Sequence, residues 1–163
     1  ALNGRTVATD SWVLPNRDGR AMLGPLLESH APLDLVIIML GTNDVGPTYR
    51  LSASEVAFGC ATLVWTVQKS QVPAGGTPEV LLIAPPRLGE LSELMELFYK
   101  GGEGTSSELA RAYQTVAQAC RCHFLDASKI VQASKVDGIH LDPAGQRALA
   151  SEVKNVITTI LTG

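Results

Sequence analysis

The sequence lacks the features that mark several large classes of protein. Its 163 residues contain no apolar run approaching the ~20 residues that a membrane-spanning helix needs. Its three cysteines (Cys60, Cys120 and Cys122) are too few and uneven for a disulfide framework, and Cys120 and Cys122 are too isolated for a zinc site. We interpret all three as buried, small apolar residues, and we expect no membrane partner.

Nucleotide- and nucleic-acid-binding motifs are missing as well. The chain contains neither G-x-G-x-x-G nor G-x-x-x-x-G-K, the usual marks of nucleotide binding. Its net charge is −3, from 13 basic and 16 acidic residues, and the basic residues form no cluster. This pattern argues against a nucleic-acid partner.

The length and composition are those of one globular domain. The length suffices for a sizeable core, and 45% of the residues are apolar. The sequence has no repeat, no low-complexity tract and no internal linker. We therefore treat residues 1–163 as a single domain.

The stretch Leu33–Asp44 (L-D-L-V-I-I-M-L-G-T-N-D) organises the chain. Residues 35–40 form an unbroken apolar run, which predicts a strand buried on both faces of a parallel sheet. Polar residues follow directly after Gly41, at the end of the strand where α/β proteins bind ligands. The amide of Asn43 could donate N–H groups to an oxyanion there. Alternatively, Asn43 and Asp44 only cap a turn or the next helix.

Strand and helix signals alternate along the rest of the chain, which predicts an α/β fold with parallel strands joined by right-handed crossovers. The two capping-box patterns, Ser52–Glu55 and Thr105–Glu108, each predict the start of a helix. We expect strands at 35–40, 80–84 and 122–125, and helices at 20–30, 53–71, 105–120 and 143–161.

The segment 87–104 crowds apolar residues and glycines together after the second strand. Because it leaves from the carboxyl end of a strand, it is expected to overhang any site located there. It could line an acyl pocket, cover a subunit interface or pack on the core.

A loop before the last helix carries Asp137 and His140. A carboxylate three residues before a histidine can accept from Nδ1, which leaves Nε2 free to act as a general base. The alternative is that Asp137 caps a turn and His140 packs beside the helix. As metal ligands, the two would need a third ligand that the sequence does not single out. His30 and His123 have no acidic partner at a sequence distance that would indicate a catalytic pair, and we interpret both as structural.

Three motifs, in order, resemble conserved blocks of the SGNH hydrolases, the GDSL-type esterases. Residues 2–6 (L-N-G-R-T) resemble the second block, residues 40–44 (L-G-T-N-D) the third, and residues 137–142 (D-G-I-H-L-D) the fifth. The chain is most similar to the small bacterial aryl and carbohydrate esterases of this family, some of which are also acyltransferases.

The resemblance implies a role for each matching residue. His140 would be the base that activates a serine, and Asp137 would orient His140. The backbone N–H of Gly4 and the side chain of Asn43 would help form the oxyanion hole. The implied fold is a three-layer α/β/α, flavodoxin-like sandwich with a five-stranded parallel sheet. No metal or organic cofactor is implied, and the expected substrate is a small aryl or carbohydrate ester with a short acyl group.

The chain departs from the family in one important respect. The G-D-S block that carries the nucleophile is absent, although it should precede Gly4 by tens of residues. The tripeptide Thr9-Asp10-Ser11 follows the second block and no apolar strand precedes it, so Ser11 is a poor candidate. Since the chain starts at Ala1 without a methionine, we expect a companion N-terminal polypeptide with the serine and the first two strands.

Two classes of function are compatible with these observations. One is a serine esterase whose nucleophile lies on that companion segment. The other is a non-catalytic binding or structural domain that retains the fold. A homo-oligomer is expected, as is a cytoplasmic location, with the periplasm as the alternative.

Overall fold

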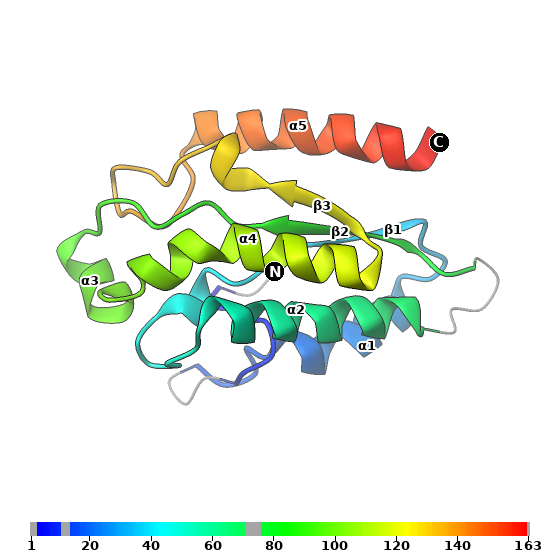
Figure 1. Cartoon of the computed structure of the whole chain (residues 1–163), viewed down its shortest axis with the longest axis horizontal. Coiled ribbons are helices and arrows are strands. Elements are labelled where there is room, and N and C mark those ends of the chain that lie inside the picture. Colours follow the sequence, from blue (N-terminus) through cyan, green and yellow to red (C-terminus); the bar gives the residue numbers. More distant parts are fainter. Residues whose placement is uncertain (1–2, 11–13, 71–75, 163) are drawn as a thin grey trace.

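The computed structural model describes residues 3–10, 14–70 and 76–162, so Ser11 lies outside the described residues (Figure 1). Strands and helices alternate along the chain, as the sequence predicts. The strands are β1 (Leu35–Ile38), β2 (Glu79–Ala84) and β3 (His123–Asp126). The helices are α1 (Gly19–Ser29), α2 (Ala53–Gln68), α3 (Glu93–Tyr99), α4 (Glu103–Cys120) and α5 (Pro143–Thr162), with 3-10 turns η1 (Asn43–Val45) and η2 (Ala127–Lys129).

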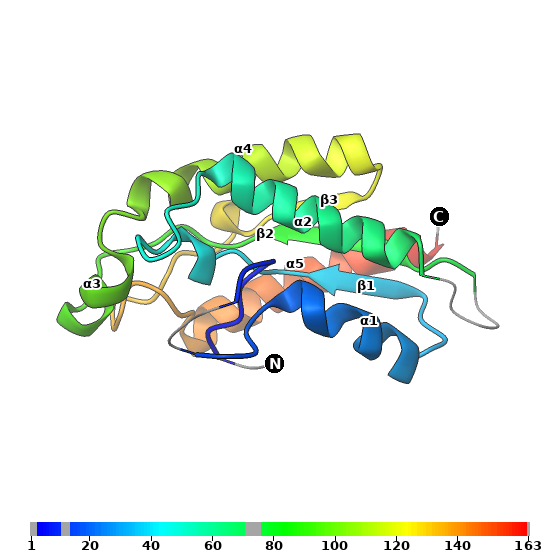
Figure 2. The same ribbon diagram turned by 90° about the horizontal axis from the view of Figure 1, so that it is seen from below.

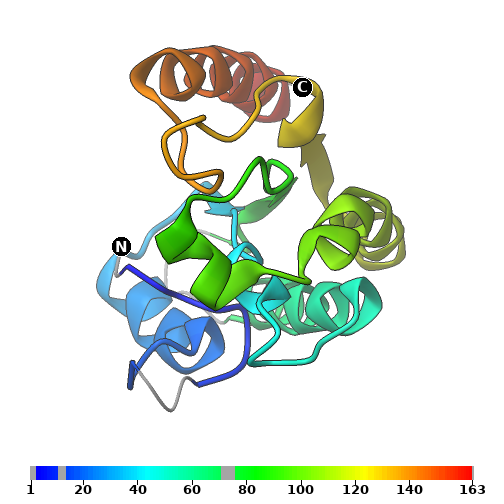
Figure 3. The same cartoon turned by 90° about the vertical axis from the view of Figure 1, so that its left-hand side faces the viewer.

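The described strands form one parallel sheet in the order β1-β2-β3, with Leu35 opposite Glu79 and Leu81 opposite His123. Helix α5 covers one face of the sheet, and α1, α2 and α4 lie on the other (Figures 1 and 3). The predicted three-layer α/β/α sandwich is therefore confirmed. The described part of the chain holds three strands, whereas the resemblance implied five.

The position of β2 in the middle of the sheet explains why its sequence is apolar without interruption. Val80, Leu82 and Ala84 face the core beneath α2 and α4, whereas Leu81 and Ile83 face α5. Successive side chains of a strand point to opposite faces, so a strand covered on both sides needs apolar residues at every position. The strand predicted at 80–84 is confirmed.

Local signals at the helix starts were only partly reliable. Ser52 and Glu55 form the predicted capping box of α2. Helix α4 begins earlier than predicted, at Glu103 after Gly102, so the capping box predicted at 105–108 is wrong. The predicted cap, Thr105, lies inside the helix, and the buried Ser106 next to it accepts from the N–H of Leu88 at 2.9 Å. No helix in the described part of the chain combines the length and apolar character needed to span a membrane.

The carboxyl ends of all three strands meet at one end of the molecule, on the left in Figure 1, where α3 and the loop before α5 also lie. Strand β1 ends at Ile38, two residues earlier than predicted, and the chain then enters η1. The parallel topology therefore brings the turn with Asn43 and the loop with His140 to the same edge of the sheet.

Gly41 allows the chain to turn sharply after β1. Its φ of +115° belongs to the region that only glycine adopts readily. A Cβ atom at Gly41 would also overlap the hydroxyl of Tyr113, which is fully buried and donates to the carbonyl of Leu40 at 2.9 Å. Backbone conformation and packing thus both require glycine before Asn43.

We expect Gly41→Ala to lower the free energy of unfolding by roughly 3 kcal/mol or more, because backbone strain adds to the collision with Tyr113. Gly101→Ala is the matched control, since Gly101 also has a positive φ but has open space around it. Strain alone should cost roughly 1–2 kcal/mol there. Equal losses for both variants in urea unfolding would show that the Tyr113 contact does not constrain this turn.

Candidate active site

The turn after β1 places the amide of Asn43 between two fixed partners. Its Nδ2 donates to the carbonyl of Arg5 at 2.8 Å, and its Oδ1 accepts from the hydroxyl of Tyr99 at 2.8 Å. A carbonyl can only accept, so the contact with Arg5 identifies which end of the amide is the nitrogen. The second N–H of Asn43 has no hydrogen-bond partner within the described residues and is available to a ligand.

Asp44, the next residue, ties the same turn to the segment that contains Gly4. The backbone N–H of Val7 donates to both carboxylate oxygens of Asp44, at 3.0 and 3.1 Å. Asp44 is 1% exposed, and burial raises the pKa of its carboxyl from 3.8 to about 6. The side chains of Asn43 and Asp44 thus bond to segments far away in sequence and not only within their own turn. The interpretation that they serve only as caps is therefore wrong.

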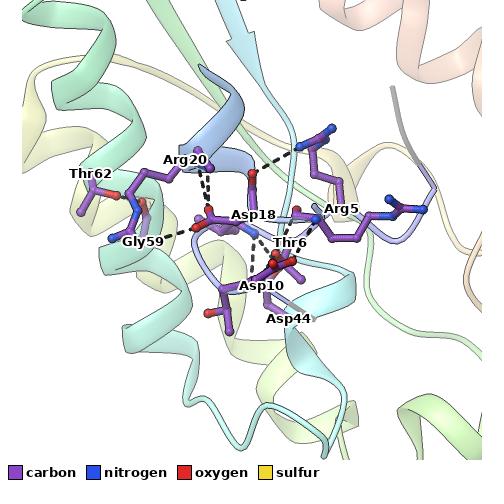
Figure 4. A network of polar contacts seen from close by, with 12 residues as sticks. Arg5, Thr6, Asp10, Asp18, Arg20, Asp44, Gly59 and Thr62 are labelled. Atoms are coloured by element: carbon purple, nitrogen blue, oxygen red, sulfur yellow. Dashed lines mark hydrogen bonds and ion pairs between the residues drawn. The ribbon is translucent and has the colours of Figure 1, made fainter. Parts of the chain in front are cut away.

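Further polar contacts fix the segment 4–7 (Figure 4). The N–H of Thr6 donates to the carbonyl of Arg17 at 3.0 Å, and the guanidinium of Arg5 donates to the carbonyl of Asp18 at 3.3 Å. Gly4 has a φ of +74°, a conformation that favours glycine. Its N–H, like the second N–H of Asn43, has no acceptor within the described residues.

Asp137 and His140 meet as the spacing predicts. The Nδ1 atom of His140 lies 2.6 Å from Oδ2 of Asp137, and the N–H groups of Ile139 and His140 donate to Oδ1 at 2.8 and 3.0 Å. Burial by itself would raise the pKa of Asp137, but the hydrogen bonds from His140 and these two N–H groups lower it to about 2. Asp137 is therefore ionised at any ordinary pH, accepts the Nδ1–H of His140 and leaves Nε2 free.

The loop that carries this pair is braced by the segment that follows β2. The N–H of Gly89 donates to the carbonyl of Gly138 at 2.8 Å, and within the loop itself the N–H of Ser134 donates to the carbonyl of His140 at 2.7 Å. Gly138 has a φ of +77°, and a Cβ atom there would overlap the carbonyl of Glu90. A side chain at position 138 is therefore incompatible with this loop.

A cavity of about 260 Å³ joins Gly4, Asn43 and His140, while Asp137 supports His140 from outside it. Its lining residues come from five segments: Asn3, Gly4, Leu14, Asn43, Thr48, Tyr49, Met95, Phe98, Tyr99 and His140. The hydroxyl groups on this lining belong to Thr48 and two tyrosines, and no serine of the described residues is among them. A larger cavity of about 500 Å³, beside Arg87 and Lys129, contains none of the predicted site residues.

Helix α3 lies within the segment 87–104, for which a pocket wall, a subunit interface and packing on the core were the alternatives. None of its residues is fully buried, although Tyr99 at its end packs against the edge of the core. Met95, Phe98 and Tyr99 line the cavity, whereas Leu94 and Leu97 are 60% and 75% exposed. The sequence suggested a pocket wall, but gave no signal that Tyr99 would contact Asn43.

The remaining candidates lie away from this cavity. His30 contacts Ser29 and the carbonyl of Leu26. His123 lies 3.1 Å from the carboxylate of Glu79 at the opposite end of the sheet, so the expectation that it lacks an acidic partner is wrong. The cysteines are free; Cys60 and Cys120 are buried, as expected, and Cys122 partly so. The described residues contain no group of three or more His, Cys, Asp or Glu side chains suited to a metal.

We expect Asp44→Asn to change how stability depends on pH. The pKa of Asp44 is higher in the folded protein than its ordinary value, so this carboxyl contributes stability below about pH 4 and loses it as the pH rises through about 6. The wild-type free energy of unfolding, relative to the variant, should fall by on the order of 1–3 kcal/mol over this range. Urea unfolding at several pH values measures it, and a constant difference would contradict the raised pKa.

Comparisons with known proteins agree with the fold. A sequence model of the GDSL-like lipase/acylhydrolase family matches residues 1–148. The structure of an M. smegmatis aryl esterase, 34% identical, superimposes with a TM-score of 0.94 over 98% of this chain and 76% of that chain. A carbohydrate acetylesterase from Sinorhizobium meliloti, 31% identical, gives the same score and the same two coverages.

A lipase/acylhydrolase from Enterococcus faecalis is 19% identical, with a TM-score of 0.67 over 94% of this chain and 71% of that chain, and shares the fold. No curated protein sequence matched the chain. The family match extends over most of the chain and includes every predicted site residue. This chain belongs to the GDSL-like lipase/acylhydrolase family.

Proposed function

We propose that this chain supplies the general base and the oxyanion donors of a serine esterase that acts on short acyl esters of aryl or carbohydrate alcohols. One observation carries the proposal: His140, Asn43 and Gly4 line the same cavity, and Asp137 holds Nδ1 of His140 from outside it. These are the groups that acyl transfer requires, apart from the nucleophile.

In the proposed reaction, a serine Oγ attacks the ester carbonyl carbon while Nε2 of His140 takes the serine proton. The tetrahedral oxyanion accepts from the free N–H of Asn43 and from the N–H of Gly4. The C–O bond to the alcohol then breaks, and His140 returns the proton to the leaving oxygen. Water attacks the acyl-serine in the same way and releases the acid, while an alcohol in its place would give acyl transfer.

The cavity supports the choice of a short acyl group. A volume of about 260 Å³ is small for a long lipid chain, and α3 provides apolar contacts through Met95 and Phe98. The similar structures belong to an aryl esterase and a carbohydrate acetylesterase, which supports small alcohols of these classes as substrates.

The nucleophile, on this proposal, lies on a companion segment that pairs with the outer edge of β1. Two side chains near that edge, Ile37 and Met39, are each 42% exposed although the strand is apolar. Hollows of about 200 and 240 Å³ flank them, one bordered by Met22 of α1 and the other by Leu149 of α5. Figure 2 shows α1 beside β1. A parallel apolar strand there would fill both hollows, and its carboxyl end would reach the cavity.

The alternative is a non-catalytic binding or structural domain, which is favoured by one observation: no serine of the described residues lines the cavity. Assembly into a homo-oligomer stays a prediction, as does a cytoplasmic location.

The base is tested by His140→Ala, which should reduce ester hydrolysis by several powers of ten, because removing one triad member abolishes the chemistry of the whole unit. Asp137→Asn should also lower the rate severely, because it removes the carboxylate that holds Nδ1 of His140. The substrate is a nitrophenyl acetate, assayed on the protein that contains this chain together with its serine.

Two histidines of the same chain serve as controls. His30→Ala and His123→Ala should leave the rate within about twofold, because neither lies at the cavity. Wild-type rates in His140→Ala would overturn the assignment of the base.

The companion segment is tested by fluorophosphonate labelling followed by intact-mass and peptide analysis. We expect a single labelled serine on polypeptide upstream of this chain's residue 1, and loss of labelling in His140→Ala because the serine is no longer activated. A label on a serine within residues 1–163 would contradict the companion segment. No label on material that is folded would favour the non-catalytic domain.

A further inference from the structure

Tyr99 contacts the one side chain that would bind the oxyanion. Its hydroxyl donates to Oδ1 of Asn43 at 2.8 Å, on the side of the amide opposite the contact with Arg5. The hydroxyl must be the donor, because the amide nitrogen faces Arg5 and leaves only an oxygen towards Tyr99. Asn43 is thus held at both ends by segments that are 38 and 56 residues away in sequence.

The backbone of Tyr99 is itself fixed against the turn that carries Asn43. A Cβ atom at Gly46 would overlap the carbonyl of Phe98, and one at Gly102 would overlap the carbonyl of Val45. The N–H of Gly102 also donates to the carbonyl of Tyr99 at 2.8 Å. The C-terminal end of α3 therefore approaches the turn closely at two glycines, and the hydroxyl of Tyr99 has a defined position.

We propose that Tyr99 is a positioning residue whose hydroxyl orients the Asn43 amide so that its free N–H faces the cavity. This inference rests on the proposed function, because it concerns the same oxyanion donor. Arg5 alone would leave the amide one anchor, about which its plane can rotate. An oxyanion donor is effective when it is already oriented before charge develops, so a loosely held amide should stabilise the transition state less.

The environment of Tyr99 agrees with a hydroxyl that acts only as a donor. Partial burial, followed by the neighbouring Tyr49, Asp44 and Asp137, raises the pKa of Tyr99 above its usual value. The hydroxyl therefore keeps its proton throughout the range in which an esterase would be assayed. Its role is separate from proton transfer, which the proposal assigns to His140.

Tyr99→Phe tests the inference, because it removes the hydroxyl and keeps the ring that lines the cavity. In the protein with its nucleophilic serine, we expect kcat to fall about tenfold and KM to change less than about twofold. The matched partner is Asn43→Ala, which should lower kcat by roughly 10²–10³. If Tyr99 acts through Asn43, adding Tyr99→Phe to Asn43→Ala should produce no further loss.

A second measurement does not depend on activity. The side-chain amide signals of Asn43 in an ¹⁵N spectrum can be assigned by their absence in Asn43→Ala. They should shift and exchange faster in Tyr99→Phe while the backbone signals of the turn remain in place.

Additive kinetic effects, or unchanged Asn43 amide signals, would overturn the role of Tyr99. If wild type hydrolyses no ester but its Asn43 amide responds to Tyr99→Phe, the proposed function fails, while the positioning of Asn43 by Tyr99 holds.

Discussion

The hydrogen bonds between residues 43–44 and residues 5–7 are the constraint on which the rest of the site depends. Asn43 and Asp44 reach the backbone of Arg5 and Val7, which lie 38 and 37 residues away in sequence. One interaction is an amide–carbonyl pair, and the other is a buried carboxylate that accepts twice from one N–H. They hold the turn with Asn43 against the segment that contains Gly4, and both residues line the same cavity.

Electrostatics then distinguish the two carboxylates of the site. Asp44 is buried, and its pKa is raised to about 6, whereas hydrogen bonds lower the pKa of Asp137 to about 2. Asp44 holds the backbone together, and Asp137 stays ionised and holds His140. Neighbouring groups thus give two identical side chains different tasks. The close approach at Gly138 keeps the second carboxylate in place.

Most of the architecture followed from local patterns in the sequence. The apolar run at 80–84 and the capping box at Ser52 predicted β2 and the start of α2, because each depends on neighbouring residues alone. The Asp137–His140 pair was predictable for the same reason, since three residues separate its members. Asn43 was predictable as a site residue because the parallel strand ends just before it.

Contacts between distant segments could not be predicted in this way. Thr105 lies inside α4 instead of capping it, the buried Ser106 accepts from the N–H of Leu88, and Glu79 of β2 pairs with His123 of β3. The approach of Tyr99 to Asn43 depends on how α3 lies against the turn after β1, which no periodicity in the sequence indicates. These contacts arise from strand register and loop closure, and they become visible only in three dimensions.

The central claim is that the cavity lined by Gly4, Asn43 and His140 is the site of acyl transfer. A crystal structure of the active protein inhibited by a fluorophosphonate tests it most directly. The account predicts the phosphorus on a serine at this cavity, with one phosphoryl oxygen within about 3.1 Å of both Nδ2 of Asn43 and the N–H of Gly4. Phosphorus bound elsewhere, or an oxygen that contacts neither group, would contradict it.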